Sequence, residues 1–156
     1  MGADLEEIVP RLAGDFALTR EPSRSALGER LRGSVATHAY AFFSREGGVL
    51  AQSLPSFLDL IPKDAPPTLR VLDTFAFHQA VLGRLLAQDE SGVEYFHSEA
   101  ELEAALKAAG GVGVLLRPTS VGQIVAVSEA RESMPPKSSF FAPKLPSALV
   151  VHPLAR

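Results

Sequence analysis

Hydrophobic and polar residues recur along the chain with two different periods, and these periods predict its secondary structure. Apolar residues at helical spacing predict helices near residues 73–87, 99–109 and 120–130. Short runs rich in β-branched and aromatic residues predict strands near residues 35–44, 49–54, 93–97, 112–117 and 148–152.

Local signals mark the ends of several of these elements. A turn sequence, Arg-Glu-Gly-Gly at 45–48, separates two of the strand-like runs and predicts a hairpin. Ser98 with Glu101, and Ser120 with Gln123, have the spacing of capping boxes, in which two orphan N–H groups are satisfied reciprocally. These pairs predict where two of the helices begin.

The N-terminal part of the chain has weaker patterns. Residues 4–13 read as a short helix, against which Pro10 counts, and residues 16–20 read as a brief strand. A second helix is expected to begin after Ser23 or Ser25 and to run to residue 32. The proline-rich stretch 54–68 reads as a connector with one helical turn near residue 57.

Together these elements predict one α+β domain that spans residues 1–156. A hairpin followed by helix-separated strands implies a mixed, mainly antiparallel sheet with helices packed on one face. Val114 and Leu116 are expected to be buried beneath the helices. His38 and Tyr40 share one face of a strand, and we expect that face to be half-exposed, although it could line a site.

Composition and charge exclude several classes of function. The formal net charge is −3, and no Lys/Arg stripe with interleaved aromatic residues is present, so nucleic acid is not an expected partner. The chain has no cysteine, which excludes disulfides and thiolate catalysis. Histidines at metal-ligand spacing, a nucleophile elbow and a P-loop are all missing, so we predict no catalytic residue, no metal and no cofactor.

The sequence also bears on the location of the protein. No run of eighteen apolar residues occurs, and the first residues do not resemble a signal peptide. We therefore expect a cytoplasmic protein without membrane contact.

The most unusual segment is 134–146, which we call the Pro-Lys segment. It holds four prolines and two lysines, and no acidic residue follows Glu132. Prolines disfavour a helix, so an extended loop anchored by Phe140 and Phe141 is predicted. Its ammonium and hydroxyl donors suit a phosphate or carboxylate ligand; the candidate ligand-binding residues are Lys137, Ser138, Ser139 and Lys144. The alternative is an exposed loop whose lysines are only solvated.

The same segment carries a family resemblance. Residues 134–150, beginning Met-Pro-Pro-Lys-Ser-Ser-Phe-Phe, resemble the C-terminal signature of domain-of-unknown-function family 1015. The phrases around residues 116–127 and 72–86 are also similar to that family. Arg117 and His78 stand in these phrases and complete the set of candidate ligand-binding residues. His78 also lies on an apolar helical stripe, where a histidine at the edge of the core is the simpler interpretation.

The resemblance implies a longer protein. Family members carry an N-terminal half with a D-G-H-H-R phrase like that of ParB-like proteins, including free-serine kinases, and this chain lacks that phrase. Ser139, Ala142 and Ala148 also depart from the usual signature. The chain is therefore expected to be an accessory, non-catalytic module for a small anionic ligand, with a catalytic half or a second copy as possible partners. Two alternatives stay open: the C-terminal half of a small-molecule kinase, and a purely structural or partner-docking domain.

Overall fold

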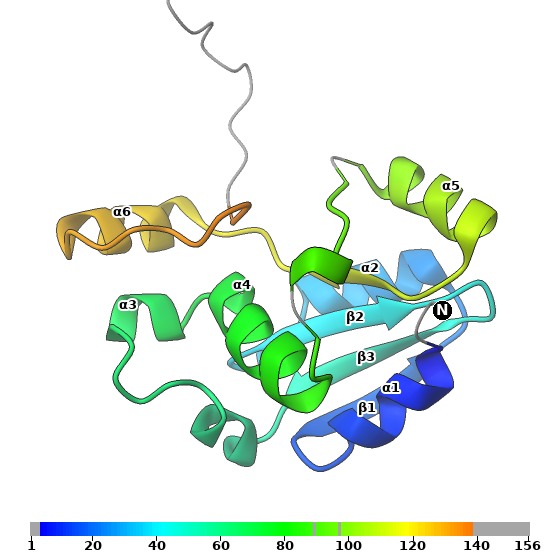
Figure 1. Cartoon of the computed structure of the whole chain (residues 1–156), viewed down its shortest axis with the longest axis horizontal. Coiled ribbons are helices and arrows are strands. Elements are labelled where there is room, and N and C mark those ends of the chain that lie inside the picture. The colour runs from blue at the N-terminus through cyan, green and yellow to red at the C-terminus, as the bar shows by residue number, and fades with distance from the viewer. Residues whose placement is uncertain (1–3, 89, 97, 139–156) are drawn as a thin grey trace, which may run out of the picture.

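The computed structural model describes residues 4–88, 90–96 and 98–138, and these form an α+β domain (Figure 1). The strands are β1 Phe16–Glu21, β2 Ala39–Phe43, β3 Gly48–Ser53 and β4 Gly113–Leu116. The α-helices are α1 Leu5–Leu12, α2 Arg24–Arg32, α3 Pro67–Arg70, α4 Asp73–Ala76, α5 Glu99–Ala109 and α6 Val121–Glu129. Shorter or irregular helices are η1 Pro55–Asp59, the π-helix η2 Phe77–Leu85, and η3 Glu90–Gly92.

The sheet has the strand order β1-β3-β2-β4, and each of its pairings is antiparallel. The predicted α+β class is confirmed, and so is the hairpin, in which β2 pairs with β3. Strand β4 lies at an edge of this sheet, opposite β1. Because an edge strand has a neighbour on one side only, Val114 and Leu116 are half-buried against the core and not fully buried as expected.

The helices cover both faces of the sheet. Tyr40 and Phe42 of β2 belong to a cluster with residues of α1, α4 and η2, whereas Ala41 and Phe43 pack with residues of α2 and α5. The prediction of helices on one face was therefore wrong. The physical reason lies in β2 itself, which is apolar and buried at every position, the pattern of a strand covered on both faces.

Several predicted elements are confirmed, and others differ. Helices α5 and α6 begin at the expected caps: Ser98 Oγ accepts from the Glu101 amide at 3.2 Å, and the capping box of Ser120 with Gln123 is complete. The helix expected over residues 73–87 is present as α4 continuing into the π-helix η2.

The strand expected at 93–97 is not found in the described residues 93–96, which follow η3. None of these four residues is buried, so the run has no buried face that would favour a place in the sheet. The strand expected at 148–152 lies outside the described residues.

Helix α6 lies beside α3, away from the helices that cover the sheet (Figure 1). The chain that follows α6 runs back along this helix (Figure 1). Ser138, the last residue of this stretch, therefore lies near the point where α6 begins.

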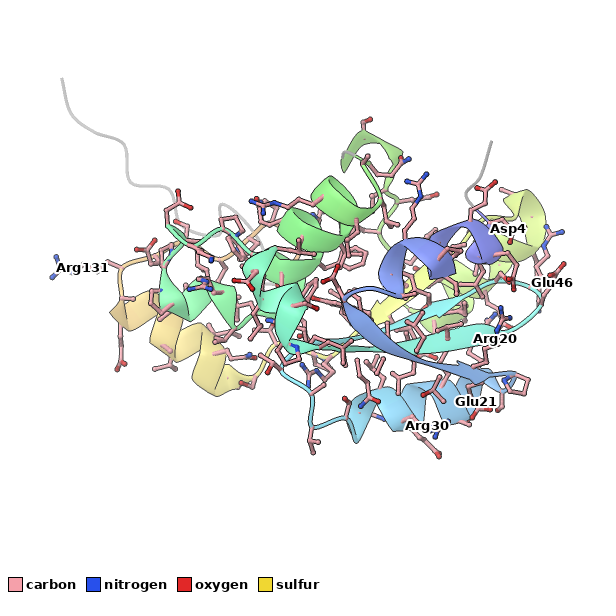
Figure 2. The ribbon with its side chains drawn as sticks, turned by 90° about the horizontal axis from the view of Figure 1, so that it is seen from below. Asp4, Arg20, Glu21, Arg30, Glu46 and Arg131 are labelled. Carbon is pink, nitrogen blue, oxygen red and sulfur yellow. The ribbon has the colours of Figure 1, made fainter. Side chains whose placement is uncertain are left out.

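Charged side chains of both signs point outward from the described part of the chain. Figure 2 shows Arg20 and Glu21 on β1 and Arg30 on α2 at the periphery. Arg20 forms a bidentate pair with Glu6, with N–O distances of 2.9 and 3.0 Å. Within the residues that the structure describes, no helix has the length and apolar character needed to cross a membrane.

Candidate functional site

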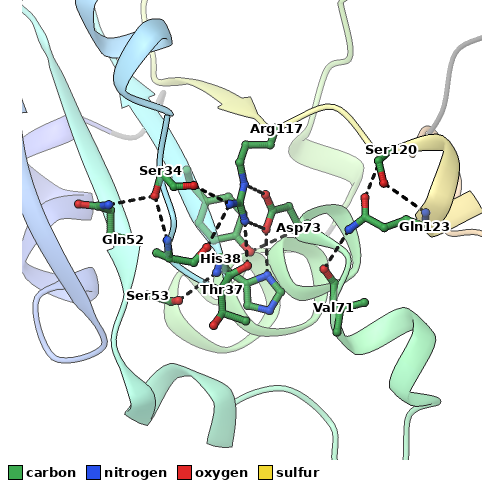
Figure 3. Close-up of polar contacts among 12 residues, drawn as sticks. Ser34, Thr37, His38, Gln52, Ser53, Val71, Asp73, Arg117, Ser120 and Gln123 are labelled. Carbon is green, nitrogen blue, oxygen red and sulfur yellow. Dashed lines mark hydrogen bonds and ion pairs between the residues drawn. The ribbon is translucent and has the colours of Figure 1, made fainter. Parts of the chain in front are cut away.

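A buried carboxylate, that of Asp73, is the centre of a polar network in the described structure (Figure 3). Asp73 is the first residue of α4, where a negative charge interacts favourably with the helix dipole. Its Oδ2 accepts a hydrogen bond from Arg117 Nε at 2.6 Å. Its Oδ1 accepts one from Arg117 Nη2 and one from His38 Nδ1, each at 2.9 Å. We call His38, Tyr40, Asp73 and Arg117 the Asp73 cluster.

Arg117 follows β4, and every N–H donor of its guanidinium group forms a hydrogen bond within the protein. An arginine has five N–H donors. Besides the two bonds to Asp73, Arg117 donates to three main-chain carbonyl oxygens, those of Ser34, Ala36 and Thr37. The hydrogen bonds to Asp73 raise the pKa of Arg117, with burial acting in the opposite direction. Arg117 thus fastens the segment before β2 to the start of α4 and has no donor left over.

His38, directly before β2, and Tyr40, near the start of β2, also form hydrogen bonds with Asp73. Since the carboxylate oxygen of Asp73 accepts, His38 Nδ1 is the donor in this hydrogen bond. His38 Nε2 is buried and has no hydrogen-bond partner among the residues that the structure describes. The Tyr40 hydroxyl donates to the Asp73 carbonyl oxygen at 3.2 Å. Burial, reinforced by the charge of Asp73, raises the pKa of Tyr40 well above its ordinary value.

This arrangement favours structure over catalysis. A His–Asp pair serves as a general base when the second imidazole nitrogen reaches a reacting group. Here His38 is completely buried, its ring packs against Phe57 at a centroid distance of 5.6 Å, and Nε2 has no partner. The expectation that His38 and Tyr40 lie on a half-exposed face was wrong, because α4 and η1 cover that face of the sheet.

An open cleft of about 400 Å³ adjoins the Asp73 cluster. Its lining residues come from the approach to β2, from the start of α4 and from the chain between β4 and α6: Thr37, Val71, Asp73, Arg117, Pro118, Thr119, Ser120 and Gln123. Ser120 Oγ accepts from the Gln123 amide at 3.2 Å, and Gln123 Oε1 accepts from the Ser120 amide at 2.9 Å. The N-terminus of α6 is therefore an ordered part of the cleft wall.

The predicted ligand-binding residues have different places. Arg117 lines the cleft. Ser138 is buried near it: its carbonyl oxygen accepts from Thr119 Oγ1 at 2.7 Å, and its own hydroxyl donates to the Pro135 carbonyl oxygen at 2.6 Å. Lys137, beside Ser138, is exposed and has a left-handed φ of 60°.

Of the remaining candidates, one lies elsewhere in the described structure and the others lie outside the described residues. His78 lies on η2, where its ring stacks on Tyr95 at a centroid distance of 6.2 Å. Ser139 and Lys144 lie outside the described residues, as do the anchors Phe140 and Phe141. The role of Lys144 beside Lys137 as a ligand-binding residue therefore stays a prediction.

Among the described residues, no group of three or more His, Asp or Glu side chains is placed to hold a metal ion. Comparison with known proteins found no matching family model, no matching curated protein and no matching solved structure. The resemblance of residues 134–150 to family 1015 therefore stays a prediction.

Sequence reasoning did not identify the Asp73 cluster. Its other members stand 33, 35 and 44 positions from Asp73, so no local spacing connects them. Two signals were present in the sequence: a histidine at the start of an entirely apolar strand, and a single arginine directly after a short apolar strand. Each is a polar residue that needs a hydrogen-bond or ion-pair partner when it is buried.

Proposed function

We propose that this chain is a non-catalytic, accessory module that binds a small anion, a phosphate or a carboxylate, in the cleft at the N-terminus of α6. The observation that carries the proposal is the hydrogen bond from Thr119 Oγ1 to the Ser138 carbonyl oxygen, 2.7 Å long. This bond holds Ser138 beside Thr119, which lines the cleft, and Lys137 is the neighbour of Ser138 in the chain.

The electrostatics of the cleft support an anion. The N-terminal end of a helix carries about half a positive charge, together with N–H groups that have no intrahelical acceptor. In α6 the capping box uses the amides of Ser120 and Gln123, which leaves the first-turn amides of Val121 and Gly122. Thr37 also lines the cleft, and we expect the Lys137 ammonium group to reach the ligand from the Pro-Lys segment.

The Asp73 cluster has a supporting role in this proposal. Arg117 and Asp73 neutralise each other at the base of the cleft, so neither repels nor strongly attracts a charged ligand. Their bonds fix Thr37 and the chain leading to Thr119, and both of these residues line the cleft. The cluster thereby fixes the shape of the cleft and takes no part in a reaction.

A reaction is not assigned to this chain. His38 is completely buried, and the described residues offer no nucleophile within hydrogen-bond distance of its Nε2. If the resemblance to family 1015 holds, the chemistry belongs to a D-G-H-H-R half outside this chain. We place the module in the cytoplasm, and the anion it binds would be a substrate or regulator of that half.

A purely structural domain is the alternative, and one observation favours it. All five donors of Arg117, the cation nearest the base of the cleft, are consumed by the protein. In that case Lys137 is a solvated surface residue.

Thermal denaturation separates the two. Inorganic phosphate and phosphoserine should raise the melting temperature, since a ligand at a hundred times its Kd stabilises the folded state by about 2.7 kcal/mol. In a protein of this size that corresponds to roughly 5–10 °C. Lys137→Ala should remove the gain, while Lys63→Ala, at an exposed lysine on another part of the chain, should keep it. Sodium chloride at matched ionic strength is the control for non-specific screening. A rise that is the same for both variants, or no rise, would leave the structural alternative.

A further inference from the structure

Helix α6 has an apolar outer face that the described residues do not cover. Val121, Gly122, Val125 and Ala126 form this face, and all four are exposed, Val121 by 74% and Val125 by 47%. On the opposite side of the helix, Val127 is buried. We call the four exposed residues the α6 outer face.

The sequence of α6 has fewer charged residues than is typical of a surface helix. In Val-Gly-Gln-Ile-Val-Ala-Val-Ser-Glu the only charged residue is the last, Glu129. A surface helix normally has a polar outer side, whereas the exposed side of α6 carries Val121 and Val125, followed one turn later by Glu129. The outer face is thus missing a covering partner in the described part of the chain.

The residues that follow Ser138 begin near α6 and are numerous enough to extend along it. Residues 130–138 run back along α6, and Thr119 Oγ1 binds the Ser138 carbonyl oxygen at 2.7 Å (Figure 1). The sequence continues from that point for eighteen residues, 139–156. Helix α6 is about 14 Å long at about 1.5 Å per residue, and even five or six extended residues span that length.

The composition of this segment suits the face. It begins with Ser-Phe-Phe, and covalent geometry limits the Cα of Phe140 to within about 7.6 Å of the Cα of Ser138. The segment contains no acidic residue, and it carries Lys144. The C-terminal end of α6 attracts cations, both through the helix dipole and through Glu129, which is exposed.

We propose that the C-terminal segment 139–156 covers the α6 outer face, with Phe140 and Phe141 as its anchors. Because the segment is tethered at Ser138, its effective concentration at the face is in the millimolar range, which a separate partner would rarely match. Burial of two phenyl rings against two valines then stabilises the contact through the hydrophobic effect.

Cysteine trapping in the full chain tests this proposal, because the chain contains no cysteine of its own. The trapping pair is Val125→Cys with Ala142→Cys, which leaves both phenylalanines in place. The matched control pair is Val35→Cys with Ala142→Cys, since Val35 is another exposed valine, 98% accessible. Under mild oxidation the trapping pair should form an intramolecular disulfide at least tenfold faster than the control pair. The rate is followed by mass spectrometry.

A second variant distinguishes anchoring from mere tethering. Phe140→Ala with Phe141→Ala, added to the trapping pair, should lower its rate to that of the control pair. The proposal is overturned if the trapping and control pairs react equally fast, or if the alanine substitutions leave the rate unchanged. It is also overturned if disulfide-linked dimers predominate, since a second copy of the chain would then occupy the face.

Discussion

Replacing Arg117 by lysine should destabilise the protein strongly although the positive charge is kept. Arg117 makes five hydrogen bonds, two to the Asp73 carboxylate and three to main-chain carbonyl oxygens. A lysine has three donors at a single point, so at least two of these five bonds are lost.

The magnitude follows from the kind of bond that is lost. Hydrogen bonds that involve a charged group contribute about 1.5–3 kcal/mol each, and the Arg117 side chain keeps some access to water, which favours the lower end. We therefore expect Arg117→Lys to lower the free energy of unfolding by roughly 3 kcal/mol. For a protein of this size the melting temperature should fall by about 6–12 °C.

The surface pair of Arg20 with Glu6 provides the matched control. It is also bidentate, but both side chains are mostly exposed, and exposed pairs contribute little to stability. Urea denaturation followed by circular dichroism would compare Arg117→Lys and Arg20→Lys with the parent. Arg20→Lys should unfold at the same urea concentration as the parent. Equal midpoints for the two variants would contradict the structural role assigned to the Asp73 cluster.

Three further predictions concern single residues. Because burial raises the pKa of Tyr40, the folded state keeps a proton that the unfolded chain releases above about pH 10. The free energy of unfolding should therefore fall as the pH rises past about 10, and Tyr40→Phe should make this fall shallower in urea titrations at several pH values. Ser98→Ala removes the cap of α5 and should cost about 1 kcal/mol in thermal denaturation; an unchanged melting curve would show that the cap contributes nothing. Gly48→Ala would place a Cβ 2.5 Å from Leu27 Cδ2 and should cost about 1–3 kcal/mol, whereas Gly14→Ala, with nothing within 4 Å, should melt like the parent.

Sequence patterns predicted those elements whose signals are local. The hairpin has its turn residues at 45–48, and α5 and α6 have their caps at Ser98 and Ser120. In each case the residues that determine the element lie within a few positions of one another. The α+β class could be predicted for the same reason, because it depends on the order of the elements.

The covering of the sheet and the polar cluster depend on distant contacts. Strand β2 is apolar at every position, a pattern that was interpreted as one buried face although it is typical of two. The partners of Asp73 could not be deduced, because His38 and Arg117 reach it only once β2 and β4 pair in register. The cleft depends on the same strand pairing, so its lining residues could not be predicted from the sequence either.

An NMR titration of the ¹⁵N-labelled chain with inorganic phosphate tests the central claim, anion binding in the cleft, most directly. The account predicts saturable shifts of the amide signals of Val121, Gly122 and Lys137, with smaller changes at Thr37. Shifts that do not saturate, or that are equally large at the exposed lysines Lys63 and Lys107, would contradict it.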